Sequence, residues 1–69
     1  MDATPAQEDI RRLLRSFGIQ ADESISAYLK ETSGPGPLRL RILLEDVTDY
    51  PQTPPPERLR LQVDGEIRR

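Results

Sequence analysis

The sequence predicts a small α+β domain in which two helices precede an antiparallel β-hairpin, in the order ααββ. Three observations support this prediction. Apolar residues in the first part of the chain recur with helical spacing. The run Gly34-Pro35-Gly36-Pro37 then interrupts regular structure, because proline lacks a backbone N–H and glycine favours turns. Beyond this run, two segments alternate apolar and polar residues, the pattern of strands with one covered face.

A first helix is expected over residues 5–17. Thr4 is a suitable N-cap, Pro5 favours the first helical position, and Gln7 has the capping-box spacing from Thr4. The apolar residues of this segment share one helical face: Ile10, Leu13, Leu14 and Phe17. Gly18 is expected to end the helix by adopting the left-handed conformation after its C-cap.

A second helix is expected over residues 22–32, with Asp22 as its N-cap. Apolar and small residues again share a common face: Ala21, Ile25, Tyr28, Leu29 and Thr32. The glycine and proline run that follows ends this helix and separates it from the strands.

Strands are expected over residues 38–47 and 58–67. With Ile42 opposite Val63, three opposite-charge pairs form on the outer face: Arg41 with Asp64, Arg39 with Glu66, and Glu45 with Arg60. A slip of two residues, with Ile42 opposite Leu61, also forms opposite-charge pairs, so we favour the first register only slightly. Gly65 is either a small residue or bulge within one long strand, or part of a tight Asp64-Gly65 turn.

A proline-rich loop, residues 48–57, is expected to join the strands. It contains Pro51 and the run Pro54-Pro55-Pro56, which favours extended polyproline backbone. The segment from Pro51 to Pro54 matches the PxxP pattern, but proline-rich loops match this pattern often by chance. We interpret the loop as a stiffened connection and not as a ligand motif.

Length and composition limit what this chain can build. Its 69 residues predict a single domain, residues 1–69, which buries only about 60% of the surface exposed in the unfolded chain. Without cysteine, the chain has neither disulfides nor thiolate metal sites to reinforce a small core, which leaves self-association or docking onto a partner. The first residues carry no secretory signal, so the expected location is cytoplasmic. The expected core is Ile10, Leu13, Leu14, Phe17, Ile19, Ile25, Tyr28, Leu29, Leu38, Leu40, Ile42, Leu44, Leu59, Leu61, Val63 and Ile67.

Catalysis is not expected. The chain has no histidine or cysteine, and its serines lie on or beside the predicted helices with no base near them in sequence. The acidic residues of segment 45–49 lack the ligand spacing and the turn glycine of a calcium loop. We therefore expect no enzyme activity, no catalytic, cofactor-binding or metal-binding residues, and no small-molecule substrate.

A non-catalytic protein-protein interaction or accessory subunit is the function class that remains, with another protein or a second copy as its partner. A two-stranded sheet is marginal alone and leaves both edges unpaired, which invites an added strand. Its outer face combines arginines with apolar residues, as protein interfaces do. The candidate partner-binding residues are Arg39, Arg41, Leu43, Val47, Tyr50 and Arg60.

The sequence leaves three interpretations of Leu43 open. Its side chain lies on the outer side of the first strand, between Arg41 and Glu45. It is an interface residue, a solvated leucine, or core covered by another element.

The alternative function is weak nucleic-acid binding by a winged-helix-like protein, because two helices and a hairpin follow the order of that fold. The helix that would enter the groove carries Glu23 and Glu31 and has no arginine for base edges. The net charge of -2 also provides no general attraction to nucleic acid or anionic membrane. Neither is an expected partner.

Overall fold

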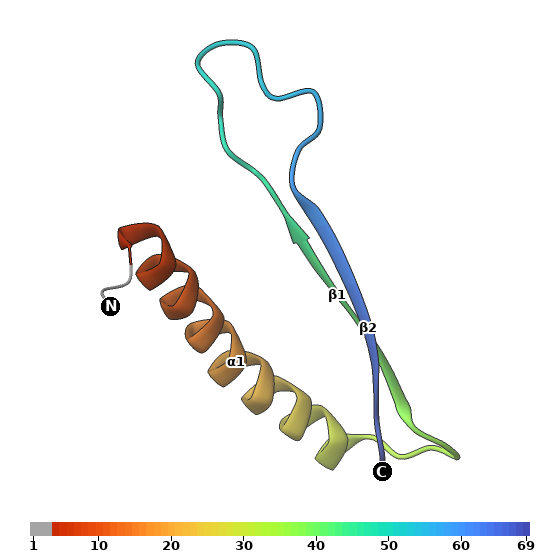
Figure 1. Cartoon of the computed structure of the whole chain (residues 1–69). Coiled ribbons are helices and arrows are strands. Elements are labelled where there is room, and N and C mark those ends of the chain that lie inside the picture. Colours follow the sequence, from red (N-terminus) through yellow and green to blue (C-terminus); the bar gives the residue numbers. More distant parts are fainter. Residues whose placement is uncertain (1–3) are drawn as a thin grey trace. The chain divides into compact units, whose positions relative to one another are not determined.

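The helix α1 begins with the capping box that the sequence predicts. In the computed structural model, which describes residues 4–69, α1 spans Pro5–Glu31 (Figure 1). The Thr4 hydroxyl accepts a hydrogen bond from the Gln7 N–H at 3.1 Å, and the Gln7 side-chain oxygen accepts one from the Thr4 N–H at 3.0 Å. These two bonds satisfy donors that a helix start leaves without intrahelical partners.

The prediction of two helices is wrong, because residues 5–17 and 22–32 fall almost entirely within one helix that continues through Gly18. Among the described residues, positive φ occurs only at Gly36, so Gly18 does not form the expected left-handed cap. A glycine inside a helix costs only about 1 kcal/mol relative to alanine. Because helix propagation is cooperative, that cost does not divide a long helix whose flanking turns both favour it.

The apolar stripe of α1 also runs through Gly18 without a change of phase. Phe17, Ala21 and Ile25 follow one another at intervals of four residues, so they lie on one face. Side-chain hydrogen bonds join neighbouring turns beyond this point, as between the Ser26 hydroxyl and Asp22 at 3.1 Å. Asp22 is therefore a residue of the helix interior and not an N-cap.

Thr32 ends the helix. Its backbone N–H and its hydroxyl both donate to the Tyr28 carbonyl oxygen, at 3.0 Å and 2.7 Å. Its own backbone is extended, with φ −126° and ψ 153°. Gly36 then adopts φ 134°, a conformation that residues with a side chain rarely adopt, and so prepares the entry into the first strand.

The strands β1 (Leu38–Glu45) and β2 (Arg60–Ile67) form a two-stranded antiparallel sheet (Figure 1). Ile42 lies opposite Val63, which confirms the favoured register and excludes the slip to Leu61. An antiparallel hairpin after helical structure is therefore the part of the fold class that is confirmed.

Gly65 is a residue of the paired strand. It lies opposite Leu40 in a register that runs without interruption from one end of the ladder to the other. The bulge and the Asp64-Gly65 turn are therefore both wrong, and the remaining interpretation, a small residue within a long strand, is correct.

Both strands are shorter at the loop end than the sequence predicts, because Asp46 turns the chain away. The Asp46 N–H still donates to the Leu59 carbonyl oxygen at 2.9 Å. Its carboxylate then accepts the Thr48 N–H at 2.9 Å, a local turn that competes with strand pairing. Residues 46–47 and 58–59 consequently belong to the connection and not to the strands.

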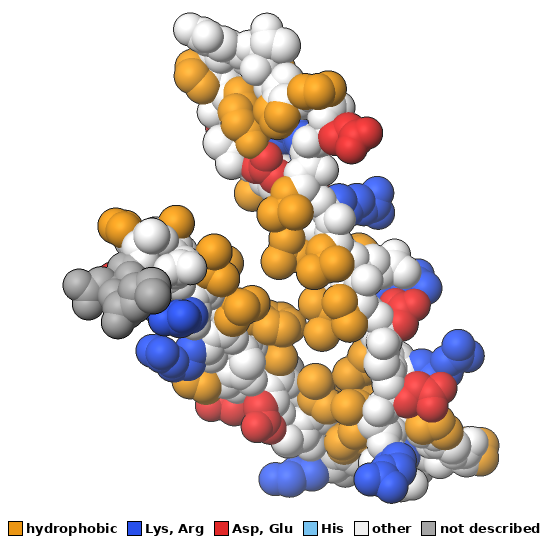
Figure 2. All heavy atoms as spheres, in the orientation of Figure 1, with side chains coloured by type: hydrophobic (Ala, Val, Ile, Leu, Met, Phe, Trp, Pro, Cys, Tyr) orange, Lys and Arg blue, Asp and Glu red, His pale blue; other side chains and the backbone are white. Residues whose placement is uncertain are grey.

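The chain forms two units, a helical unit that ends at Gly34 and a hairpin unit, Pro35–Arg69. The expected domain, residues 1–69, begins with three residues that lie outside the described part of the chain. Within residues 4–69 neither unit taken by itself buries a side chain, so the expected core does not form inside either unit. Figure 2 shows hydrophobic side chains gathered in rows on the surface of each unit.

Replacing Gly18 by alanine tests the continuous helix. We expect Gly18→Ala to stabilise α1 by about 1 kcal/mol, because alanine is the better helix former and its Cβ would meet nothing within 4 Å. Thermal melts followed by far-UV circular dichroism measure the effect. Gly36→Ala is the matched control, and it should lower the melting temperature because φ is 134° there. A lower melting temperature for Gly18→Ala would indicate a helix break at Gly18.

Candidate functional site

The hairpin has two chemically different faces. Successive side chains of a strand point to opposite sides, and directly paired residues share a side. The charged face comprises Arg39, Arg41, Leu43, Glu45, Arg60, Gln62, Asp64 and Glu66. The apolar face comprises Leu38, Leu40, Ile42, Leu44, Leu61, Val63, Gly65 and Ile67. Figure 2 shows hydrophobic side chains along one side of the hairpin and charged side chains along the other.

Two ion pairs cross the charged face, and they differ in quality. Arg41 binds Asp64 with Nε to Oδ1 at 2.9 Å and Nη2 to Oδ2 at 3.5 Å. Arg39 approaches Glu66 only to 3.9 Å, and its side chain is 85% exposed. Exposed pairs of this kind contribute about 0–1 kcal/mol each. The Asp64 carboxylate therefore holds the Arg41 side chain in place, whereas Glu66 contacts Arg39 only weakly.

A third pair of opposite charges is aligned across the strands, but its side chains do not form an ion pair. Glu45 lies directly opposite Arg60. Within residues 4–69, ion pairs closer than 4.0 Å do not include either side chain. Together with Arg39, these residues place incompletely neutralised charges at the two ends of the charged face.

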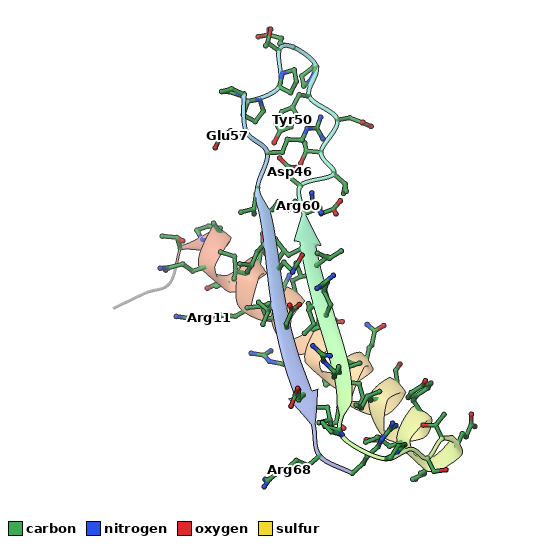
Figure 3. All side chains as sticks on the ribbon, turned by 90° about the vertical axis from the view of Figure 1, so that its right-hand side faces the viewer. Arg11, Asp46, Tyr50, Glu57, Arg60 and Arg68 are labelled. Carbon is green, nitrogen blue, oxygen red and sulfur yellow. The ribbon has the colours of Figure 1, made fainter. Side chains whose placement is uncertain are left out.

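The loop between the strands is organised around the Asp46 carboxylate. It accepts hydrogen bonds from the Thr48 N–H and from the Tyr50 hydroxyl. Arg58 donates to the Asp46 carbonyl oxygen at 3.4 Å, and its guanidinium lies over the Tyr50 ring, 5.2 Å from the centroid. Figure 3 shows Asp46 and Tyr50 in the loop end of the hairpin, beyond Arg60.

These contacts shift the pKa values of both titratable partners. Hydrogen bonds from the Thr48 hydroxyl, the Tyr50 hydroxyl and the Thr48 N–H lower the pKa of Asp46 from 3.8 to about 2. The hydrogen bond to Asp46 raises the pKa of Tyr50 above 10.0, because the protonated phenol is the donor. Asp46 is thus kept ionised and Tyr50 is kept neutral, which suits a structural role.

The structure brings four of the six predicted site residues onto one surface. Arg39, Arg41 and Leu43 lie on the charged face of β1, and Arg60 lies at the start of β2 on the same face. Leu43 is 49% exposed, so the hairpin unit itself does not cover it.

The other two predicted residues lie in the loop. Val47 follows β1 and is 83% exposed. Tyr50 is half-buried, and its hydroxyl and ring are both engaged within the loop, by Asp46 and Arg58. Tyr50 therefore orders the loop, and no described contact joins it to Leu43.

Sequence reasoning did not find the loop cluster or the acidic half of the charged face as parts of a site. The Asp46-Val47-Thr48 segment carries a usable signal, because an aspartate commonly accepts the N–H two residues ahead in a turn. The contact of Arg58 with Tyr50 spans the proline-rich loop, and no local pattern in the sequence indicates it.

Neither ligand chemistry nor similarity to other proteins narrows the function further. Within residues 4–69, histidine, cysteine, aspartate and glutamate do not gather into a set of three that could hold a metal ion. The one helix of this part of the chain, α1, is not long and apolar enough to cross a membrane. No family model, curated protein or solved structure matches the chain.

The pH dependence of the loop follows from the lowered pKa of Asp46. Because the folded-state pKa lies below the usual value, the contribution of Asp46 to loop order is present above pH 3.8 and is lost as pH falls toward about 2. NMR titration of the carboxylate measures this pKa. Thr48→Ala should raise the pKa of Asp46 most, and Tyr50→Phe should also raise it.

Thr53→Ala supplies the control for this titration, because Thr53 is an exposed residue of the same loop outside the Asp46 cluster. It should leave the pKa of Asp46 where it is. An Asp46 pKa of 3.8 in the unmodified chain, or no response to Thr48→Ala, contradicts the described loop.

Proposed function

We propose that this protein is a small non-catalytic interaction or assembly subunit whose partner is another protein or a second copy of itself. The observation that supports this function best is the exposure of the apolar face of the hairpin. Ile42, Leu61 and Val63 are 44%, 52% and 49% exposed, although they lie together on the paired strands. Contiguous apolar surface of this kind is characteristic of interaction sites.

The energetics of a two-stranded sheet point in the same direction. Full burial stabilises an aliphatic side chain by about 1.5–3 kcal/mol, and side chains that stay half exposed realise only part of this. The cross-strand ion pairs on the charged face add little, since both are exposed. An isolated hairpin is marginal in water, whereas added strands or a covering element make a sheet stable. Association supplies the missing burial.

The helical unit offers a second surface of the same kind. Phe17 and Tyr28, two large apolar residues of α1, are also about half exposed. An amphipathic helix gains stability by laying its apolar stripe against another apolar surface. A chain with two such surfaces is suited to assembly.

Nucleic-acid binding by a winged-helix-like protein is not carried forward as a second candidate. That alternative depends on a helix-turn-helix, whereas residues 5–31 form a single helix. The arginines of the charged face also have acidic residues opposite them, so no uniformly basic surface arises there. No specific observation favours this function.

Concentration-dependent folding tests the proposed function. If association completes the burial, the melting temperature should rise with protein concentration, because binding stabilises only the folded form. Circular dichroism melts over a wide range of concentration, together with light scattering, measure this. A monomer that melts at one temperature throughout, with amides strongly protected from exchange, would show that the chain buries its own core and would overturn the proposal.

Leu43→Lys tests whether the charged face takes part in association. We expect the variant to fold normally, because Leu43 is a surface residue and such changes alter stability by less than about 0.5 kcal/mol. The dissociation constant for self-association should rise about tenfold, equivalent to roughly 1.4 kcal/mol, because the change adds a charge beside Arg41. Gel filtration with light scattering measures it.

Val47→Lys is the matched control for this variant. Val47 lies two residues beyond the end of β1 and its side chain is largely exposed. Because it lies outside the paired strands, we do not include it in the proposed interaction surface. The change should alter neither folding nor association. Unchanged self-association of Leu43→Lys would identify Leu43 as a solvated leucine and remove it from the interaction surface.

A further inference from the structure

The open edge of β1 presents a regular row of backbone groups. The Asp46 N–H donates to Leu59 of the other side of the hairpin, so the backbone of Asp46 faces that side. Hydrogen-bonded and non-hydrogen-bonded pairs alternate along an antiparallel ladder. The N–H and C=O groups of four residues therefore point to the open edge: Arg39, Arg41, Leu43 and Glu45. Because β1 contains neither proline nor glycine, none of these donors is missing.

The side chains of β1 are arranged almost symmetrically about Ile42. An antiparallel copy of β1, placed with Ile42 opposite Ile42, brings Leu40 opposite Leu44 on the apolar face. On the charged face it brings Arg39 opposite Glu45, twice by symmetry. These are the charges that the hairpin neutralises least, since Arg39 is 3.9 Å from Glu66 and Glu45 forms no ion pair within residues 4–69.

We propose that β1 pairs with β1 of a second copy of this chain, antiparallel and centred on Ile42, to form a four-stranded sheet. This inference rests on the proposed assembly function and names the partner and the edge. Arg41 then exchanges its open backbone groups with Leu43 of the second copy, and Arg39 does so with Glu45. The interface is isologous, so it closes at two chains.

Neighbouring registers of the same edge are less favourable. Centring the pair on Arg41 places two Arg41 guanidiniums opposite each other, which is repulsive. Centring it on Leu43 pairs Arg41 with Glu45, but Arg41 is already held by Asp64 at 2.9 Å. It also leaves Arg39 opposite Val47, which lies outside the strand. The register centred on Ile42 uses the least neutralised charges and every open backbone group.

The edge of β2 is the weaker template. A copy of β2 centred on Val63 places Leu61 opposite Gly65, where there is no side chain to pack. Pairing through β1 instead joins Leu40, Ile42 and Leu44 of both copies into one apolar surface across four strands, above the size at which sheets become independently stable.

Mixing two charge-reversed variants tests the pairing. In Arg39→Glu alone and in Glu45→Arg alone, like charges face each other across the interface, so each dissociation constant should rise at least about tenfold at low ionic strength. In an equimolar mixture, the carboxylate introduced at position 39 of one chain meets the guanidinium introduced at position 45 of the other. Heterodimers should therefore form with nearly the original affinity. Mixing changes no contact within a chain, so the recovery reports only contacts between chains.

The corresponding variants of β2, Arg60→Glu and Glu66→Arg, are the matched control. They reverse the same two charge types on the opposite edge and should show no loss that mixing repairs. Loss and recovery in the β2 variants, or association of Arg39→Glu and Glu45→Arg like the unmodified chain, would overturn pairing through β1. Both results leave the proposed assembly function standing, because the unmodified chain still associates.

A cross-link keeps the test decisive if a charge variant fails to fold. The chain has no cysteine, so Ile42→Cys carries a single thiol on the proposed two-fold axis. Its two copies would lie within disulfide reach, Cα to Cα less than about 7 Å. Val63→Cys, at the position paired with Ile42 on β2, would be about 14 Å from its counterpart across three strand spacings and should not cross-link.

Oxidation therefore separates the possible outcomes. A rapid disulfide dimer of Ile42→Cys but not of Val63→Cys supports the pairing. The reverse pattern overturns it in favour of the β2 edge. An unmodified chain that light scattering shows to be monomeric at high micromolar concentration overturns the pairing itself. Concentration-independent melting together with amides strongly protected from exchange would separately decide against the assembly function.

Discussion

The backbone pairing of Ile42 with Val63 determines the register from which the other features of the hairpin follow. Because directly opposite residues share a face, this one alignment gathers the aliphatic side chains on one side and the charges on the other. It brings Arg41 to 2.9 Å from Asp64 and leaves Arg39 and Glu45 with little neutralisation. It also determines which backbone groups of β1 point to the open edge.

The hairpin could be predicted from the sequence because its signals are local and agree with one another. Period-two alternation marks both strands, and the number of opposite-charge pairs favours the correct register. The capping box at Thr4 is equally readable. The expectation of a helix break at Gly18 is wrong because it gives a single glycine more weight than the stripe through Phe17 and Ala21, which keeps its phase. The spacing of the apolar residues on its own therefore indicates one continuous helix.

The candidate site was predictable only in part, since Arg58 and Tyr50 meet across a loop whose path depends on contacts distant in sequence. Burial could not be predicted from pattern at all. Alternation shows which side of a strand is apolar, but it does not show whether anything covers that side. Neither unit covers its own apolar row, so the stability of each unit depends on what packs against that row.

Gly65 has a consequence for how far this protein can aggregate. Sheets with two open edges can extend without limit, and edge strands are the usual starting points of fibrils. In β2 the row of aliphatic side chains is interrupted at Gly65, between Val63 and Ile67, and carboxylates of Asp64 and Glu66 flank the gap. A glycine also weakens strand propensity at that point. Strand addition at the β2 edge is therefore disfavoured compared with addition at the β1 edge, and this difference opposes fibril growth.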